Sequence, residues 1–223
     1  MNAFDRARAV VERGISDRTF PAAAVEVGSS AGVAWQQAFG TLTFDSGSPP
    51  TALGTPFDLA SLTKVLATTT IAMELVGSGR LRLDERVADV FDEWRDPHRE
   101  PVVVRDLLEH ASGLPPRLFD APPDTRREFE HEISRIPLEY APRTKSVYSD
   151  LDFILLGFLL ENRTRASLST LFTSEVRWIG SGDPDRTLTF SLASQERLAA
   201  APTVPLADDL RRGRALVGEV HDN

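Results

Sequence analysis

The sequence feature that most constrains the fold is a helical pattern of apolar residues that begins one residue after Ser61. These residues recur at spacings of three and four, which is typical of a helix packed on one face. They are Leu62, Val65, Leu66, Ala72, Met73 and Val76. Gly77 and Gly79 follow, as glycines often do at helix C-termini. We therefore expect Ser61 in the first turn of a helix, with Lys64 one turn later on the same face.

Ser61 and Lys64 together suggest nucleophilic chemistry. Lys64 is one of two lysines among 25 basic residues, and all the others are arginines. An arginine does not lose its proton in a protein, whereas a buried lysine can lose one and act as a base. The neighbours Leu62, Val65 and Leu66 predict apolar surroundings. Burial there would lower the pKa of Lys64, which could then accept the Ser61 proton. The alternative is a serine N-cap followed by a solvated lysine.

The start of a helix is also a favourable place for a nucleophile. Free backbone N–H groups and the positive end of the helix dipole lie there. Ser61 would have them beside it when negative charge develops during attack on a carbonyl group.

Composition excludes several functions. The chain has no cysteine, which excludes disulfides, thiolate metal sites and cysteine nucleophiles. The histidines show no metal-ligand spacing, so neither a metal nor another cofactor is expected. They are His98, His110, His131 and His221. The net charge is −8, the pI is about 5.1 and no basic block stands out, so nucleic acid is not an expected partner.

The sequence also bears on location. No apolar run reaches the length of a membrane span. Charged residues interrupt every apolar stretch in residues 1–15, so this segment does not read as a signal peptide. As written, the chain is expected to be soluble and cytoplasmic, and exported only if the true N-terminus lies upstream. The sequence does not indicate an oligomeric state.

Strands precede helices along the chain. Residues 22–27 and 33–39 read as two strands joined by a small-residue turn at 29–32. A short amphipathic helix precedes them, with one face formed by Phe4, Ala7, Val10 and Val11. The Pro- and charge-rich residues 115–145 lack a sustained period and are expected to form a surface excursion. Further helices are expected at 102–110, 151–160, 168–172 and 195–200, with a short helix or irregular segment at 81–91.

A second candidate group stands at the start of the 151–160 helix. Tyr148 there could relay a proton between a serine nucleophile and its leaving group, as a phenol or, beside a cationic Lys64, as a phenolate. Alternatively, Tyr148 only anchors the helix, and Ser149 or Asp150 caps it. His110 is expected to lie at a helix end with its ring bonded to the backbone, rather than in catalysis.

Three segments in this order carry a resemblance to a known family. They are Ser61-x-x-Lys64, then Leu107-Leu108-x-His110-x-Ser112-Gly113-Leu114, then Tyr148-x-Asp150. The chain resembles the serine beta-lactamase and penicillin-binding-protein-like superfamily. It is most similar to the class C-like branch, which includes esterases and D-Ala-D-Ala carboxypeptidases.

The resemblance implies a fold, a reaction and a site. The fold is an α/β (α+β) one, an antiparallel sheet flanked by helices plus a helical region. The reaction is acyl transfer on an ester, amide or beta-lactam carbonyl of a small-molecule or peptide substrate. Ser61 would be the acylated nucleophile, Lys64 its proton acceptor and Tyr148 the second acid/base. The oxyanion hole would use the backbone N–H of Ser61 and one from a late strand.

The sequence departs from the family pattern in two ways. Asp150 replaces the family asparagine; its charge would raise the pKa of Lys64, and it cannot donate a hydrogen bond to substrate. Whether Asp150 contacts substrate or only caps the helix stays open. The family's Lys- or His-x-Gly motif does not appear after Tyr148.

The absence of the Lys- or His-x-Gly motif also determines the domain organisation that we expect. We expect one incomplete domain over 1–223, with its C-terminal strands missing. It would comprise a helix-and-sheet part (1–60), a mainly helical part (61–217) and the start of the missing remainder (218–223). Without the third motif, the chain as given is expected to be inactive. The rivals are an esterase or peptidase without lactamase activity, and a non-catalytic fragment or pseudoenzyme that binds a ligand or partner without turnover.

Overall fold

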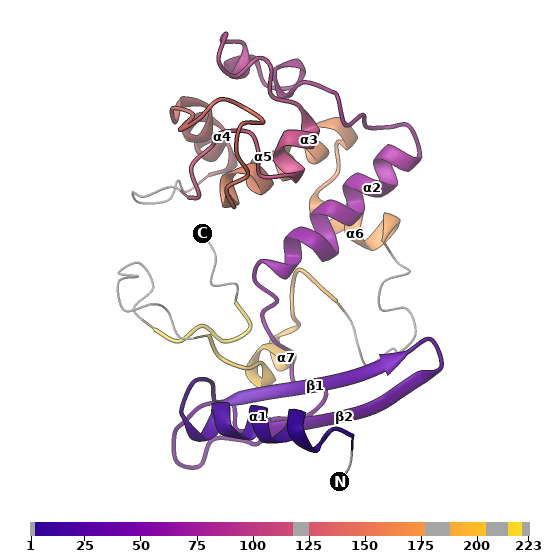
Figure 1. Cartoon of the computed structure of the whole chain (residues 1–223), viewed down its shortest axis with the longest axis vertical. Coiled ribbons are helices and arrows are strands. Elements are labelled where there is room, and N and C mark those ends of the chain that lie inside the picture. The colour runs from indigo at the N-terminus through magenta and orange to yellow at the C-terminus, as the bar shows by residue number, and fades with distance from the viewer. Residues whose placement is uncertain (1–2, 118–124, 177–187, 204–213, 220–223) are drawn as a thin grey trace. The chain divides into compact units, whose positions relative to one another are not determined.

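The computed structural model describes residues 3–117, 125–176, 188–203 and 214–219. They fall into two compact units (Figure 1). The first contains the residues up to 60 together with those described from 188 onward, and the second contains 61–176. Each unit is described by itself. No described helix is both long and apolar enough to cross a bilayer.

The first unit is built on an antiparallel hairpin. Strands β1 (Ala22–Ser29) and β2 (Gly32–Gly40) pair from Ala22 opposite Gly40 to Ser29 opposite Gly32. The register shifts between Val27 and Gly28, which marks a bulge. Gly40 has a positive φ of 73°, and a side chain there would collide with the carbonyl oxygen of Pro21. Both predicted strands are confirmed, each extended by a few residues.

Helix α1 (Asp5–Ser16) lies along the hairpin (Figure 1). The ring of Phe4, the residue before α1, stacks on Trp35 of β2 with centroids 5.1 Å apart, and Arg8 donates to Gln37 at 3.0 Å. The rest of the expected apolar face is poorly covered, because Val10 is 70% exposed. Helix α7 (Ser194–Ala199) also belongs to this unit, and the predicted helix at 195–200 is thereby confirmed.

The second unit is helical and its core surrounds helix α5 (Asp150–Thr164). Ser149 caps α5 by accepting a hydrogen bond from the Asp152 N–H at 3.3 Å. Helices α3 (Val104–Leu108), α4 (Arg126–Arg135) and α6 (Leu168–Glu175) pack against α5. The fully buried leucines of α5 are Leu151, Leu155, Leu156, Leu159 and Leu160. The predicted buried helix at 151–160 is therefore confirmed, as is the helix at 168–172.

The segment after Ser61 forms a π-helical turn, η1 (Lys64–Thr69), that continues into α2 (Thr70–Gly77). π-Helical turns often occur near functional sites. The predicted apolar surroundings are wrong, because Leu62 and Val65 are each 55% exposed. The buried face consists instead of Ala67, Thr68, Thr70, Ile71, Ala72 and Leu75. The segment is apolar over more than one face, so its period alone did not show which face is buried.

The segment 81–91 is largely irregular, as one alternative predicted, with a 3₁₀ turn η2 (Val87–Asp89), followed by η3 (Asp92–Trp94). No helix was singled out within the surface excursion expected at 115–145, but α4 lies there. Thr125 caps α4 and pairs reciprocally with Glu128. Only Ile133 of α4 is buried, so the helix carries too few apolar residues to show a sequence period.

The α5 core predicts a clear difference in stability between buried and exposed positions. Leu155→Ala should lower the free energy of unfolding by about 2–5 kcal/mol, because it removes buried methyl groups and leaves a cavity. The control Met73→Ala, at a side chain 64% exposed, should change it by about 0.5 kcal/mol or less. Urea unfolding followed by circular dichroism measures both. Equal losses in the two variants would contradict a core centred on α5.

Candidate active site

Ser61 lies in a turn just before η1. The preceding residue, Ala60, has a left-handed backbone with φ of 47°, which is uncommon for a residue with a side chain. The Asp58 carboxylate supports this turn by accepting a hydrogen bond from the Ala60 N–H at 2.8 Å. The Ser61 carbonyl accepts from the Lys64 N–H at 3.1 Å. The predicted first-turn placement of Ser61 and Lys64 agrees with this geometry.

Two side chains converge on the Ser61 hydroxyl. Lys64 Nζ lies 3.1 Å from Ser61 Oγ, and the Tyr148 hydroxyl donates to the same oxygen at 2.6 Å. Tyr148 comes from 87 residues further along the chain, immediately before α5. Lys64 Nζ also lies 5.1 Å from the centre of the Tyr148 ring. The structure therefore brings the three sequence-predicted residues Ser61, Lys64 and Tyr148 into one cluster.

Asp150 belongs to the same cluster through Lys64. Its carboxylate forms an ion pair with Lys64 Nζ at 2.8 Å. The alternative in which Asp150 caps the helix is wrong, because Ser149 is the cap and Asp150 is the first residue of α5. As the first helical residue, Asp150 points its carboxylate at the cation of Lys64 instead.

Two opposing expectations for the pKa of Lys64 came from the sequence, a lowering by apolar neighbours and a raising by Asp150, and the structure agrees with the second. Burial disfavours the ammonium form, but hydrogen bonds to Asp150 and Tyr148 and the charge of Asp150 outweigh it, so the pKa of Lys64 is raised above its usual 10.5. The expected lowering by apolar neighbours is therefore wrong, and the expected raising by Asp150 is confirmed. Because the folded state holds this proton more tightly, the interaction stabilises the fold fully below pH 10.5 and is lost as the pH rises through the raised pKa.

His110 lies behind Tyr148. Its Nδ1 accepts a hydrogen bond from the Ser149 N–H at 3.1 Å, which confirms the expected bond between ring and backbone. Asp152, fully buried in the first turn of α5, places Oδ2 3.5 Å from the same nitrogen. The sequence reasoning did not single out Asp152. A carboxylate between the apolar residues Leu151 and Phe153 was the signal that could have identified it.

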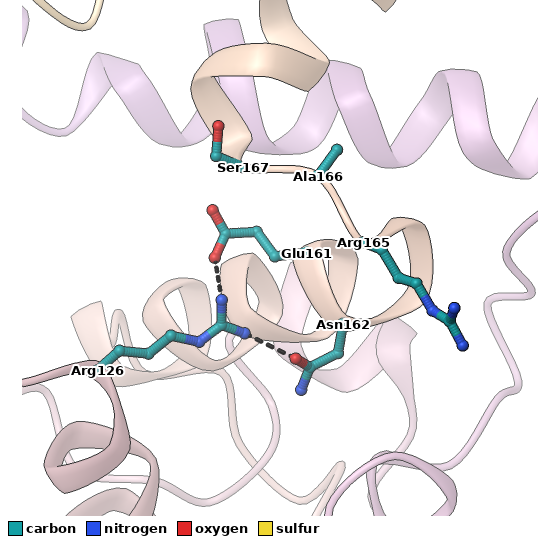
Figure 2. Close-up of a pocket in the computed structure, with 6 residues that line it drawn as sticks. All are labelled: Arg126, Glu161, Asn162, Arg165, Ala166 and Ser167. Carbon is teal, nitrogen blue, oxygen red and sulfur yellow. Dashed lines mark hydrogen bonds and ion pairs between the residues drawn. The ribbon is translucent and has the colours of Figure 1, made fainter.

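A separate recess of about 360 Å³ lies where α4, α5 and the start of α6 meet (Figure 2). Its arginine, Arg126, is already engaged by Glu161 at 2.5 Å and Asn162 at 2.9 Å, contacts that tie α4 to α5. None of the Ser61 cluster lines this recess. Among the residues that can be described, no group of His, Asp and Glu side chains is arranged to hold a metal ion.

Comparison with known proteins gives the family. A model of the beta-lactamase family matches residues 7–212. A provisionally named D-alanyl-D-alanine carboxypeptidase of Escherichia coli K12 is 34% identical over 128 residues, 50% of this chain and 29% of that protein. An N-acetylmuramyl-L-alanine amidase of Bacillus subtilis 168 is 32% identical over 136 residues, 55% of this chain and 31% of that protein. The chain belongs to the beta-lactamase family, and its match spans less than a third of these relatives.

Solved structures agree on the fold. A class C beta-lactamase superposes with a TM-score of 0.78 at 19% identity, covering 99% of this chain and 57% of that one. A penicillin-binding protein homologue from Caulobacter crescentus gives 0.74 at 21% identity, covering 93% and 56%. Identities this low establish the fold alone. The predicted beta-lactamase/transpeptidase-like fold is thereby confirmed.

The pairing of Asp150 with Lys64 predicts that Asp150→Asn lowers the pKa of Lys64, because the carboxylate that stabilises the ammonium is removed. With only two lysines, the chain gives two [¹³Cε]lysine NMR signals, and Lys145→Arg assigns the one from Lys64. The Lys64 signal should titrate at lower pH in the asparagine variant. Titration at an unchanged pH would show that the carboxylate does not control Lys64.

Proposed function

We propose that this chain carries the acylation centre of a serine hydrolase that acts on an ester, amide or beta-lactam carbonyl. The observation that carries the proposal is the convergence of Lys64 Nζ and the Tyr148 hydroxyl on Ser61 Oγ. A serine becomes a nucleophile when a base lies within hydrogen-bond reach and a further group orients that base. Lys64 is such a base, and Asp150 orients it.

Ser61, Lys64 and Tyr148 each then take part in a step of the acyl transfer. Ser61 Oγ forms a bond to the carbonyl carbon while its proton passes to the free amine of Lys64. The tetrahedral intermediate collapses as the bond to the leaving group breaks, and Tyr148 delivers the proton that this group needs. Tyr148 recovers a proton from the Lys64 ammonium, to which it is hydrogen-bonded. Water then hydrolyses the acyl-enzyme by the reverse proton path. Because the pKa of Lys64 is raised, the free amine is scarce at neutral pH and acylation should speed up as the pH rises.

Two kinds of evidence support a carbonyl substrate. The relatives with which the chain shares its family are named for cleavage of amide or lactam bonds, as carboxypeptidase, amidase and beta-lactamase. In addition, Ser61 precedes a helical segment whose first N–H groups favour developing negative charge. Asp150 is not needed for substrate contact in this proposal, since its carboxylate is engaged by Lys64.

Ligand binding without turnover is the second candidate. The observation that favours it is the Lys64–Asp150 ion pair, which keeps the proposed base protonated at neutral pH. A binder would leave Ser61 unmodified by reagents that require a nucleophile, so covalent labelling separates the two candidates.

A fluorescent fluorophosphonate tests the proposal directly. Ser61 Oγ should bond to phosphorus with loss of fluoride, which adds one label per chain at Ser61, located by peptide mass spectrometry. Ser61→Ala should abolish labelling, whereas Ser78→Ala, at an exposed serine outside the cluster, should leave it unchanged. An unlabelled parent chain that is folded by circular dichroism would overturn the proposal that this chain carries a working acylation centre.

The role of Lys64 as a base predicts that Lys64→Arg lowers the labelling rate as much as Lys64→Ala. Arginine keeps the positive charge but cannot accept the Ser61 proton. The control is Lys145→Arg, which replaces the other lysine and should label at the parent rate. Substantial labelling of the Lys64→Arg variant would instead assign Lys64 a purely electrostatic role.

A further inference from the structure

Tyr148 must be held accurately although it is exposed. Its side chain is 52% exposed, yet its hydroxyl lies 2.6 Å from Ser61 Oγ. A displacement of about 1 Å in a reacting group can lower a rate by about 10²-fold. Because a half-exposed phenol can rotate freely unless its surroundings restrain it, the restraint has to come from the residues that contact Tyr148.

His110 contacts the chain on both sides of Tyr148. Its carbonyl accepts a hydrogen bond from the Val147 N–H at 2.9 Å, and its ring Nδ1 accepts one from the Ser149 N–H at 3.1 Å. The same ring lies against the Tyr148 ring, with centroids 4.7 Å apart. His110 has a left-handed backbone with φ of 54°, an unfavourable conformation that the surrounding bonds must stabilise.

Asp152 in turn holds the His110 ring. It is fully buried, and its Oδ1 accepts a hydrogen bond from the Ser112 hydroxyl. Its Oδ2 faces His110 Nδ1 at 3.5 Å and has no hydrogen-bond partner among the described residues. Phe153 also packs against the His110 ring, with centroids 5.0 Å apart. The imidazole is therefore contacted by Asp152, Phe153 and the Tyr148 ring.

We propose that His110, held in place by the buried carboxyl group of Asp152, is the positioning residue that keeps the Tyr148 hydroxyl against Ser61. Neither His110 nor Asp152 touches the Ser61 hydroxyl, so both act through Tyr148. Because Nδ1 accepts the Ser149 N–H, the ring is neutral with its proton on Nε2. Burial raises the pKa of the Asp152 carboxyl, which favours its uncharged form beside the neutral ring. The effect on catalysis rests on the function proposed above.

A matched pair of variants tests the role of His110. His110→Asn places an amide oxygen where Nδ1 lies, and asparagine tolerates a positive φ, so the Ser149 N–H keeps an acceptor. His110→Ala removes the acceptor and the ring. We expect the maximal fluorophosphonate labelling rate to fall about tenfold to a hundredfold in His110→Ala and by no more than about threefold in His110→Asn, with the reagent concentration for half-maximal rate unchanged in both.

NMR gives a readout that does not depend on reactivity. The chain has two tyrosines, so [¹³Cζ]tyrosine labelling gives two signals, and Tyr140→Phe assigns the one from Tyr148. Loss of the hydrogen bond to Ser61 is calibrated by Ser61→Ala. His110→Ala should shift the Tyr148 signal in the same direction and remove hydrogen-exchange protection from the Ser149 amide, whereas His110→Asn should preserve both.

Two variants of Asp152 provide a second, independent test. Asp152→Asn keeps an acceptor for Ser112 and fills the same space beside the His110 ring, so it should match the parent in labelling and NMR. Asp152→Ala should behave like His110→Ala. If either alanine variant leaves the Tyr148 signal as in the parent, the positioning role is overturned. A parent chain that resists labelling while the NMR pattern holds would overturn the proposed function and leave the positioning of Tyr148 supported.

Discussion

The burial of helix α5 is the constraint on which the site depends. Five leucines along α5 are almost completely buried, and α3, α4 and α6 pack against the helix. This packing fixes the helix start, where Tyr148, Ser149, Asp150 and Asp152 follow one another within five residues. Tyr148 and Asp150 reach the Ser61 cluster because the leucines behind them cannot move without leaving the core. Helix α5 therefore both stabilises the fold and positions the residues of the site.

The charges of the cluster oppose the simplest catalytic arrangement. Apolar burial of Lys64 would favour a free amine, but the ion pair with Asp150 favours the ammonium and prevails. An asparagine in place of Asp150 would keep the shape of the site without this charge. Asp150 thus sets the protonation of the proposed base.

Much of the fold could be read from the sequence where apolar periods were strong. The hairpin of β1 and β2 and the buried helix α5 were predicted within a few residues, since their patterns reflect burial directly. Helix α4 was missed because only Ile133 of it is buried. The buried face of the segment after Ser61 was misassigned, because apolar side chains such as Val65 and Ile71 occur on both its exposed and its buried face.

For this protein, the sequence by itself determined which chemical groups are present: a serine and lysine one turn apart, a tyrosine at a helix start, and a carboxylate two residues after that tyrosine. Only the tertiary structure decided that Tyr148 and Ser61 meet across 87 residues and that Asp150 pairs with Lys64 rather than capping α5. It also decided that Asp152 and His110 lie together behind Tyr148. Local spacing fixes neighbours within one helix, whereas contacts between distant segments and the resulting balance of charge depend on how helices pack.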